Sequence, residues 1–150
     1  MNDIIYIVIK NYDEGLAKRQ PWYSVRKLKD DLESHNIAVK VVSSISNIPD
    51  DFNGCAIKVF SLKDVFCKKR GGFKLVYFVT FPIYGLGKFI TLPKRIIYEN
   101  WTDLKRILLL SFIPKFILKN KMLKADEVIV ISDRSEKYLS QIVGVKKYIP

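Results

Sequence analysis

The chain has 150 residues and a formal net charge of +11, with 49% hydrophobic and 27% charged residues. This composition excludes an intrinsically disordered chain, and the length suffices for one domain that buries about two thirds of the surface its unfolded form exposes. The longest apolar stretch, 107–118, is broken by Pro114 and Lys115, so it falls short of the roughly 18 residues that a membrane-spanning helix needs. Because the first ten residues also lack the cationic start of a signal peptide, we expect one cytoplasmic domain, 1–150.

The first third of the chain begins with the pattern of a strand followed by a helix. Residues 4–9 (IIYIVI) form a nearly continuous β-branched run, which is typical of a strand buried on both faces of a parallel sheet. After the polar loop 11–20, Pro21 suits the first turn of a helix because its missing N–H needs no partner there. The apolar residues that follow share one face of that helix: Trp22, Val25, Leu28 and Leu32.

Three more strands are expected by residue 80. Asn36 can take the left-handed conformation that ends a helix, and His35 beside it suits a polar position at the helix C-terminus. The runs 37–42, 55–60 and 74–80 then have strand length and strand composition.

The second half alternates helical and strand patterns. Residues 88–101 and 103–121 are expected to be helical, 127–131 (EVIVI) a buried strand, 133–143 a helix and 146–149 a short last strand. This alternation predicts an α/β fold with a mostly parallel sheet and helices on both faces. Since ligands bind at the carboxyl ends of such strands, we expect a site along the rim formed by 11–20, 61–62, 80–87 and 132–134.

Cysteine and histidine content excludes several kinds of site. Cys55 and Cys67 have no metal-ligand spacing, so we expect two reduced, buried thiols, and a single histidine excludes a histidine-rich metal site. The chain has neither a Gly-x-Gly-x-x-Gly motif nor a P-loop, which argues against a self-contained nucleotide-binding enzyme.

Most of the positive charge lies in the stretch from Lys68 to Lys124, which has 13 basic and two acidic residues interleaved with aromatic side chains. Such a segment favours an anionic, partly apolar partner such as a membrane surface. The basic residues proposed for membrane contact are Lys88, Lys94, Arg95, Lys105, Arg106, Lys115, Lys119 and Lys121. The alternatives are an ordinary solvated face and a non-enzymatic module that binds nucleic acid or membrane. Against nucleic acid, there is no recognition motif, and the run 107–110 is very apolar.

From Lys124 the chain reads KADEVIVISDRSEKYLSQIVGVKKYIP, and this resembles the end of the N-terminal domain in GT-B glycosyltransferases of the family 4 type. Those enzymes carry an "ADxVIxxS" strand, a helix, a glycine and a strand ending in "IPNGVD". Residues 25–42 (VRKLKDDLESHNIAVKVV) also look like the family's first helix and second strand, often "LAxxLxxxGHEVxVV", with Asn36 in place of the glycine.

The resemblance implies a Rossmann-like acceptor-binding domain that forms the N-terminal half of a two-domain enzyme. It implies no metal and no cofactor, with a nucleotide sugar as co-substrate and a membrane-associated, anionic or lipid-linked acceptor. Three features depart from the family: only Gly15 stands in the first strand-to-helix loop, 80–87 lacks a histidine, and the donor-binding domain is missing. We expect either an excised half or a subunit whose donor-binding domain acts in trans, with excision favoured by the end at Pro150.

The rim supplies the candidate site residues. Asp13 and Glu14 could act as a base on an acceptor hydroxyl, or be ordinary loop acids beside Lys18 and Arg19. The residues that could bind substrate are Gly15, Lys18, Arg19, Thr80, Tyr84, Gly85, Ser132 and Arg134. Ser132 is equally explained as a helix cap, and Gly15 as a turn residue.

Overall fold

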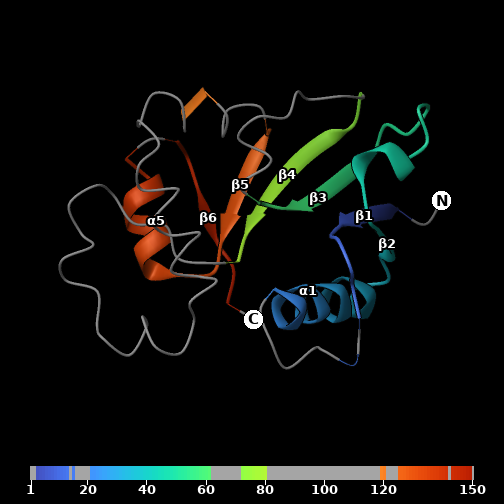
Figure 1. Ribbon diagram of the computed structural model, residues 1–150, viewed down its shortest axis with the longest axis horizontal. Coiled ribbons are helices and arrows are strands. Elements are labelled where there is room, and N and C mark those ends of the chain that lie inside the picture. Colours follow the sequence, from blue (N-terminus) through green and yellow to red (C-terminus); the bar gives the residue numbers. More distant parts are fainter. Residues whose placement is uncertain are drawn as a thin grey trace.

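A computed structural model describes residues 3–13, 15, 21–61, 72–80, 119–120, 125–141 and 143–149, and a six-stranded sheet organises them (Figure 1). Its strands are β1 (Ile4–Val8), β2 (Ala38–Val42), β3 (Cys55–Val59), β4 (Lys74–Val79), β5 (Glu127–Val130) and β6 (Lys146–Lys147). The described helices are α1 (Trp22–Ser34), the short 3-10 helix η2 (Ile45–Asn47) and α5 (Asp133–Leu139).

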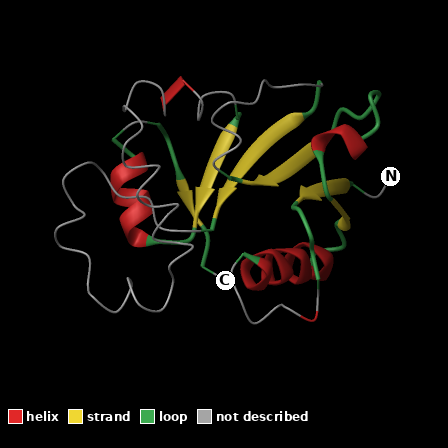
Figure 2. Ribbon diagram, in the orientation of Figure 1, coloured by secondary structure: helices red, strands yellow, loops and turns green. Residues whose placement is uncertain are grey.

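Every strand pair is parallel, and the strand order is β2-β1-β3-β4-β5-β6 (Figure 2). This is the doubly wound order of flavodoxin-like sheets with one further strand at the edge. The predicted α/β, Rossmann-like fold is therefore confirmed.

Alternation along the strands divides the core between two faces of the sheet. One face, called here the α1 face, packs against Val25 and Leu28 of α1. Its buried strand residues are Ile7, Ile9, Ile57, Val76 and Phe78. The opposite face, called here the α5 face, packs against Leu139 of α5. Its buried strand residues are Tyr6, Val8, Ala56, Leu75, Tyr77, Val79, Val128 and Val130. Helices on both faces, as predicted, explain why these strands are apolar on both sides.

Helix α1 begins and ends close to the predicted residues. Pro21 directly precedes its first residue, and Asn36 has φ 61°, the left-handed conformation expected after the helix. His35 lies at the C-cap with its Nδ1 2.8 Å from the carbonyl oxygen of Asp31. The structure thus confirms a helix-terminal position for the only histidine of the chain.

Two elements near the C-terminus are shorter than expected. Helix α5 ends at Leu139 and not at Val143, and the Ser140 hydroxyl donates to the carbonyl of Lys137 at 3.2 Å, a local bond that competes with helix continuation. Strand β6 covers only 146–147, because it pairs with β5 alone through two residues. The expected helices 88–101 and 103–121 lie almost entirely outside the described residues, as does Cys67.

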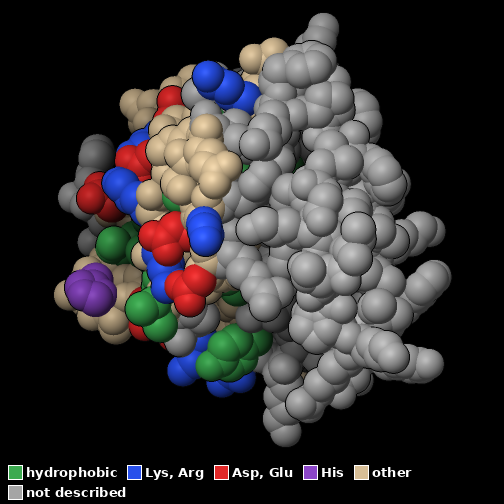
Figure 3. All heavy atoms as spheres, turned by 90° about the vertical axis from the view of Figure 1, so that its left-hand side faces the viewer, with side chains coloured by type: hydrophobic (Ala, Val, Ile, Leu, Met, Phe, Trp, Pro, Cys, Tyr) green, Lys and Arg blue, Asp and Glu red, His purple; other side chains and the backbone are tan. Residues whose placement is uncertain are grey.

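The described residues are close to electroneutral. They include 12 Lys and Arg against 11 Asp and Glu, so nearly all of the net charge of +11 belongs to the rest of the chain. Acidic and basic side chains are interspersed on the surface in Figure 3. Within these ranges, no helix has the combination of length and hydropathy that crossing a bilayer requires.

Candidate functional site

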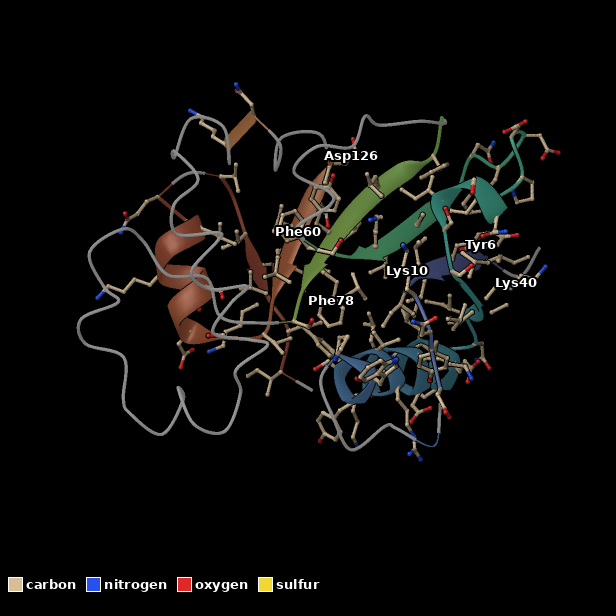
Figure 4. The ribbon with its side chains drawn as sticks, in the orientation of Figure 1. Tyr6, Lys10, Lys40, Phe60, Phe78 and Asp126 are labelled. Carbon is tan, nitrogen blue, oxygen red and sulfur yellow. The ribbon has the colours of Figure 1, made fainter. Side chains whose placement is uncertain are left out.

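The carboxyl edge of the sheet has its topological switch point between β1 and β3. From β1 the chain passes to β2 on one side, and β3 then lies on the other side of β1. Connections that leave the two strands in different directions open a crevice at this point in doubly wound sheets, where ligands bind. Lys10 and Phe60 follow β1 and β3 there and are labelled in Figure 4.

The backbone just after β1 has an unusual and well-anchored conformation. Asn11 has φ 53°, in the left-handed region that asparagine tolerates better than most side chains. The indole Nε1 of Trp22 donates to the carbonyl oxygen of Asn11 at 2.9 Å. This hydrogen bond holds the first residue of α1 against the backbone that follows β1, at the edge of the candidate site.

The structure brings two of the predicted site residues together. The backbone N–H of Gly15 donates to Oδ1 of Asp13 at 2.7 Å, which forms a tight turn at the exposed edge. A Cβ on residue 15 would lie 3.1 Å from that Oδ1, so the turn favours glycine. Asp13 thus has at least a turn-forming role. Glu14, Lys18 and Arg19 lie outside the described residues.

Thr80 is the predicted site residue at the end of β4, and it is only 5% exposed. Its side chain is therefore nearly buried at the carboxyl end of β4. Tyr84 and Gly85, which were expected to continue this part of the rim, lie outside the described residues.

Ser132 lies where β5 leads into α5. Its carbonyl oxygen accepts the N–H of Glu136 at 2.9 Å, so it stands at the start of that helix. The neighbouring carboxylate of Asp133 binds Nζ of Lys147, and this hydrogen bond is the main cause that raises the pKa of Lys147. The backbone of Arg134 is in α5, but its side chain is not among those described.

Of the eight basic residues expected to contact a membrane, the structure describes Lys119, which is exposed. The other seven, Lys88, Lys94, Arg95, Lys105, Arg106, Lys115 and Lys121, lie outside the described residues. The membrane contact therefore stays a prediction.

Sequence reasoning missed two lysines near the switch point. Lys58 lies within β3, half-buried, and is paired with Val8 of β1 and Tyr77 of β4. Lys10 follows β1 and is exposed. The sequence did contain a signal for these two residues. Each is a charged residue in or directly after an otherwise apolar strand run, where every second side chain points to the same face of the sheet.

The described ranges contain no group of three or more His, Cys, Asp or Glu side chains that could hold a metal ion. Cys55 is a free, half-buried thiol at the start of β3, and burial is the main cause that raises its pKa. An inert structural thiol is the natural interpretation, since reactive cysteines have a lowered pKa.

The chain matches no model of a known protein family, no characterised protein and no solved structure. Function is therefore inferred from the residues themselves. At the described part of the carboxyl edge, the carboxylates of Asp13 and Asp133 are both hydrogen-bonded, whereas lysine and hydroxyl groups are more numerous. Such an edge can bind an anionic or hydroxylated ligand through its lysine and hydroxyl groups.

Proposed function

We propose that this chain is the acceptor-binding domain of a GT-B glycosyltransferase of the family 4 type. The observation that carries the proposal is the folding of the described residues 125–141 and 143–149, which belong to the segment that most resembles that family. Its "ADEVIVIS" part contains strand β5, helix α5 follows, and β6 adds to the edge of the same parallel sheet. This order of elements is the one that the resemblance implies.

The proposed reaction transfers a sugar from a nucleotide sugar to an acceptor bound at the carboxyl edge. A donor-binding domain, in cis or in trans, supplies the nucleotide-sugar site. Asp13 and Glu14 are the candidate bases for the acceptor hydroxyl. Thr80 and Ser132 follow β4 and β5, whose carboxyl ends lie at the same edge of the parallel sheet. Neither a metal nor a further cofactor is part of the proposal.

We place the enzyme at the cytoplasmic surface of a membrane, with an anionic or lipid-linked acceptor. The support is the 13 basic against two acidic residues from Lys68 to Lys124, interleaved with aromatic and aliphatic side chains. Each Lys or Arg near an anionic surface contributes about 1 kcal/mol, so part of this set suffices for peripheral attachment.

The transferase activity is tested with the product of the complete reading frame, a lipid extract and radiolabelled nucleotide sugars. Label should pass from at least one sugar nucleotide into the lipid phase, and Asp13→Asn tests the proposed base. Absence of transfer from every common sugar nucleotide, with a folded protein, would overturn the enzymatic proposal.

Membrane binding is tested separately by co-sedimentation with vesicles of phosphatidylglycerol or phosphatidylcholine. We expect binding to the anionic vesicles that weakens as salt is added. Changing four residues of the basic set to Gln should weaken it: Lys105, Arg106, Lys115 and Lys119. The matched control changes four lysines of the nearly neutral part, and it should retain binding: Lys27, Lys29, Lys40 and Lys137.

Equal binding to both vesicle types, or an equal loss in the two variants, would contradict a membrane contact by this segment. Salt-dependent binding of a labelled oligonucleotide at sub-micromolar protein, without vesicle binding, would instead favour the nucleic-acid alternative.

A further inference from the structure

Strand β2 is an edge of the sheet. It lies at one end of the strand order, and among the strands that the structure describes it pairs with β1 alone (Figure 1). The N–H of Ala38 donates to the carbonyl oxygen of Asp3 at 3.1 Å, so the backbone of Ala38 is directed toward β1. The N–H and C=O of one strand residue point to the same side, and that side alternates along the strand. The backbone groups of Val39 and Val41 therefore point away from β1.

This edge lacks the features that usually prevent an exposed strand from pairing, which are a proline, a bulge or a charged side chain at the edge. Strand β2 has no proline, and its register with β1 is continuous over all five residues. Its one charged residue, Lys40, is directed inward, with Nζ 6.0 Å from the centre of the Tyr6 ring on β1 (Figure 4). Within the described ranges 3–13 and 21–61, which include the segments before and after β2, the edge is thus available for a further strand.

The side chains of this edge suit a second copy of the same chain. A two-fold axis can pair β2 with itself in the antiparallel sense, which gives the self-complementary type of contact that most homodimers have. Val39 and Val41 pack on the α1 face of the sheet. Across the axis they would continue the same apolar row into the second copy, and such cross-strand pairs of β-branched residues stabilise an antiparallel pair.

Two of the possible alignments of the paired strands are unfavourable. An alignment centred on Lys40 would place this residue directly opposite Lys40 of the second copy, and like charges in that position destabilise a strand pair. An alignment centred on Val39 would require the N–H of Ile37 as a donor. That N–H already donates to the carbonyl oxygen of Leu32 at 3.1 Å.

The alignment centred on Val41 has neither problem. The two copies of Val41 lie opposite each other and exchange both backbone hydrogen bonds. Lys40 then lies opposite Val42 of the second copy, so the two ammonium groups are separated. Val39 lies opposite Ser43, which adds further pairs of backbone groups on each side of the axis.

Helix α1 flanks this edge with charges of both signs. Asp31 faces the middle of the sheet, because its carboxylate accepts the hydroxyl of Tyr148, whose ring packs on Phe78 of β4. Residues two positions away lie on the opposite side of a helix, so Lys29 and Glu33 face the β2 side. Their charged groups lie 4.0 Å apart. A two-fold axis sets this row beside the same row in reverse, so the basic end of one meets the acidic end of the other.

We propose that two copies of this chain associate through β2, in the antiparallel alignment centred on Val41, to form one continuous sheet with six strands from each copy. The inference does not depend on the glycosyltransferase proposal, because it follows from the backbone and the charges at the edge. Antiparallel pairing directs the carboxyl edges of the two sheets to opposite sides. Each candidate site is therefore formed within one copy.

Sedimentation equilibrium of the purified protein, from micromolar to submillimolar concentration, tests the association, and we expect a reversible equilibrium between monomer and dimer. Val41→Pro removes the central N–H of the interface and no hydrogen bond to β1, and edge strands tolerate proline at such positions. The loss of two hydrogen bonds should weaken the dimer about tenfold or more. The matched control Val41→Thr keeps the N–H and the branched shape, so it should dimerise as the unmodified chain does.

Three results of this experiment would overturn the proposal. The first is a monomer at every concentration, and the second is a dimer that a folded Val41→Pro variant leaves unchanged. The third is an equal weakening by Val41→Pro and Val41→Thr, because pairing of backbone groups does not depend on the valine side chain.

A second measurement uses the unmodified chain and covers the case in which Val41→Pro fails to fold. Amide hydrogen exchange is followed by NMR at a low and a high protein concentration. The N–H groups of Val39, Val41 and Ser43 should exchange more slowly at the high concentration, because the dimer supplies their acceptors. Tyr23 is the control, since N–H groups in the first turn of a helix have no intrahelical acceptor. Exchange at the three edge residues that is independent of concentration, or slowing that is equal at Tyr23, would refute the proposal.

Discussion

The carboxylate of Asp126 accepts a hydrogen bond from the backbone N–H of Leu75 at 2.7 Å, and the N–H of Asp126 donates to the carbonyl of Leu75, also at 2.7 Å. These two bonds join the start of β5 to the start of β4, one residue before the pairing of Val76 with Glu127. Asp126 belongs to the "ADEVIVIS" stretch, and its two bonds fix where β5 begins.

We predict that Asp126→Ala destabilises the fold by about 1–2 kcal/mol, because the N–H of Leu75 loses its acceptor at a partly buried position. Asp126→Asn should lose less, since its amide oxygen can still accept that bond. Urea denaturation of the three proteins measures the difference. Equal stability of Asp126→Ala and the unmodified chain would show that the bond contributes nothing.

Gly54 is required by its close contact with Phe52. A Cβ at this position would lie 2.6 Å from Cζ of Phe52, whose ring is packed against Tyr6 at 4.8 Å and Phe73 at 6.1 Å between centroids. Because both neighbours restrict movement of the ring, Gly54→Ala should destabilise the fold by about 1–3 kcal/mol.

Gly72 offers the control for this substitution, since no heavy atom lies within 4 Å of a Cβ built there. Gly72→Ala should leave the thermal midpoint nearly unchanged. In the background Phe52→Leu, whose shorter side chain removes the clash, Gly54→Ala should cost much less. An undiminished cost in that double variant would contradict the steric explanation.

Glu127 should control part of the stability at acid pH. Its carboxylate binds Nζ of Lys74 at 2.8 Å and Nζ of Lys146 at 3.3 Å, and these hydrogen bonds, that of Lys74 first, hold its pKa below the ordinary value of 4.5. The unfolded chain therefore takes up the proton more readily than the folded one. The stability due to this group is present above about pH 4.5 and is lost as the pH falls through the lowered pKa.

We predict that Glu127→Gln is less stable than the unmodified chain at neutral pH and loses less of its remaining stability as the pH falls below about 4.5. The ammonium group of Lys74 lies closer to the carboxylate than that of Lys146 does. Lys74→Met should therefore reproduce more of this change than Lys146→Met. Urea midpoints measured across this range test the prediction, and parallel acid profiles for all four proteins would contradict it.

The parts of the fold that were predicted are those determined by residues close together in the sequence. The apolar runs of β1 and β3, the amphipathic face of α1 and the left-handed Asn36 each depend on a few consecutive positions. The turn between Asp13 and Gly15 is local as well, and a turn was one of the two expectations for Gly15.

The features that were missed depend on contacts between distant segments. The bond between Asp126 and Leu75 requires β5 to lie beside β4, and the strand order is not encoded in any short pattern. The same holds for Lys10 and Lys58, which become neighbours only when β1 pairs with β3. Composition identified the basic segment of the chain, but it could not identify two lysines that share one face of the sheet.

A contact between distant parts of the sequence joins Tyr148, just after β6, to α1. Its hydroxyl donates to the carboxylate of Asp31, and its ring packs edge to face on Phe78 at 6.0 Å between centroids. Burial first, and then the hydrogen bond to Asp31, raise the pKa of Tyr148 above its ordinary value of 10.0. The folded state therefore retains the phenolic proton at pH values where the unfolded chain releases it, so this contribution is complete below about pH 10 and is lost as the pH rises further.

We predict that Tyr148→Phe lowers stability at neutral pH by about 1 kcal/mol, since it removes one hydrogen bond and keeps the contact with Phe78. The difference from the unmodified chain should shrink above about pH 10, because the variant has no phenolic proton to lose. Thermal midpoints followed from neutral to alkaline pH measure this convergence. Asp31→Ala should couple to Tyr148→Phe, so that the double variant is more stable than the sum of the two single losses predicts. Strictly additive losses, or a difference that persists unchanged at alkaline pH, would mean that the hydroxyl of Tyr148 does not hold the last strand to α1.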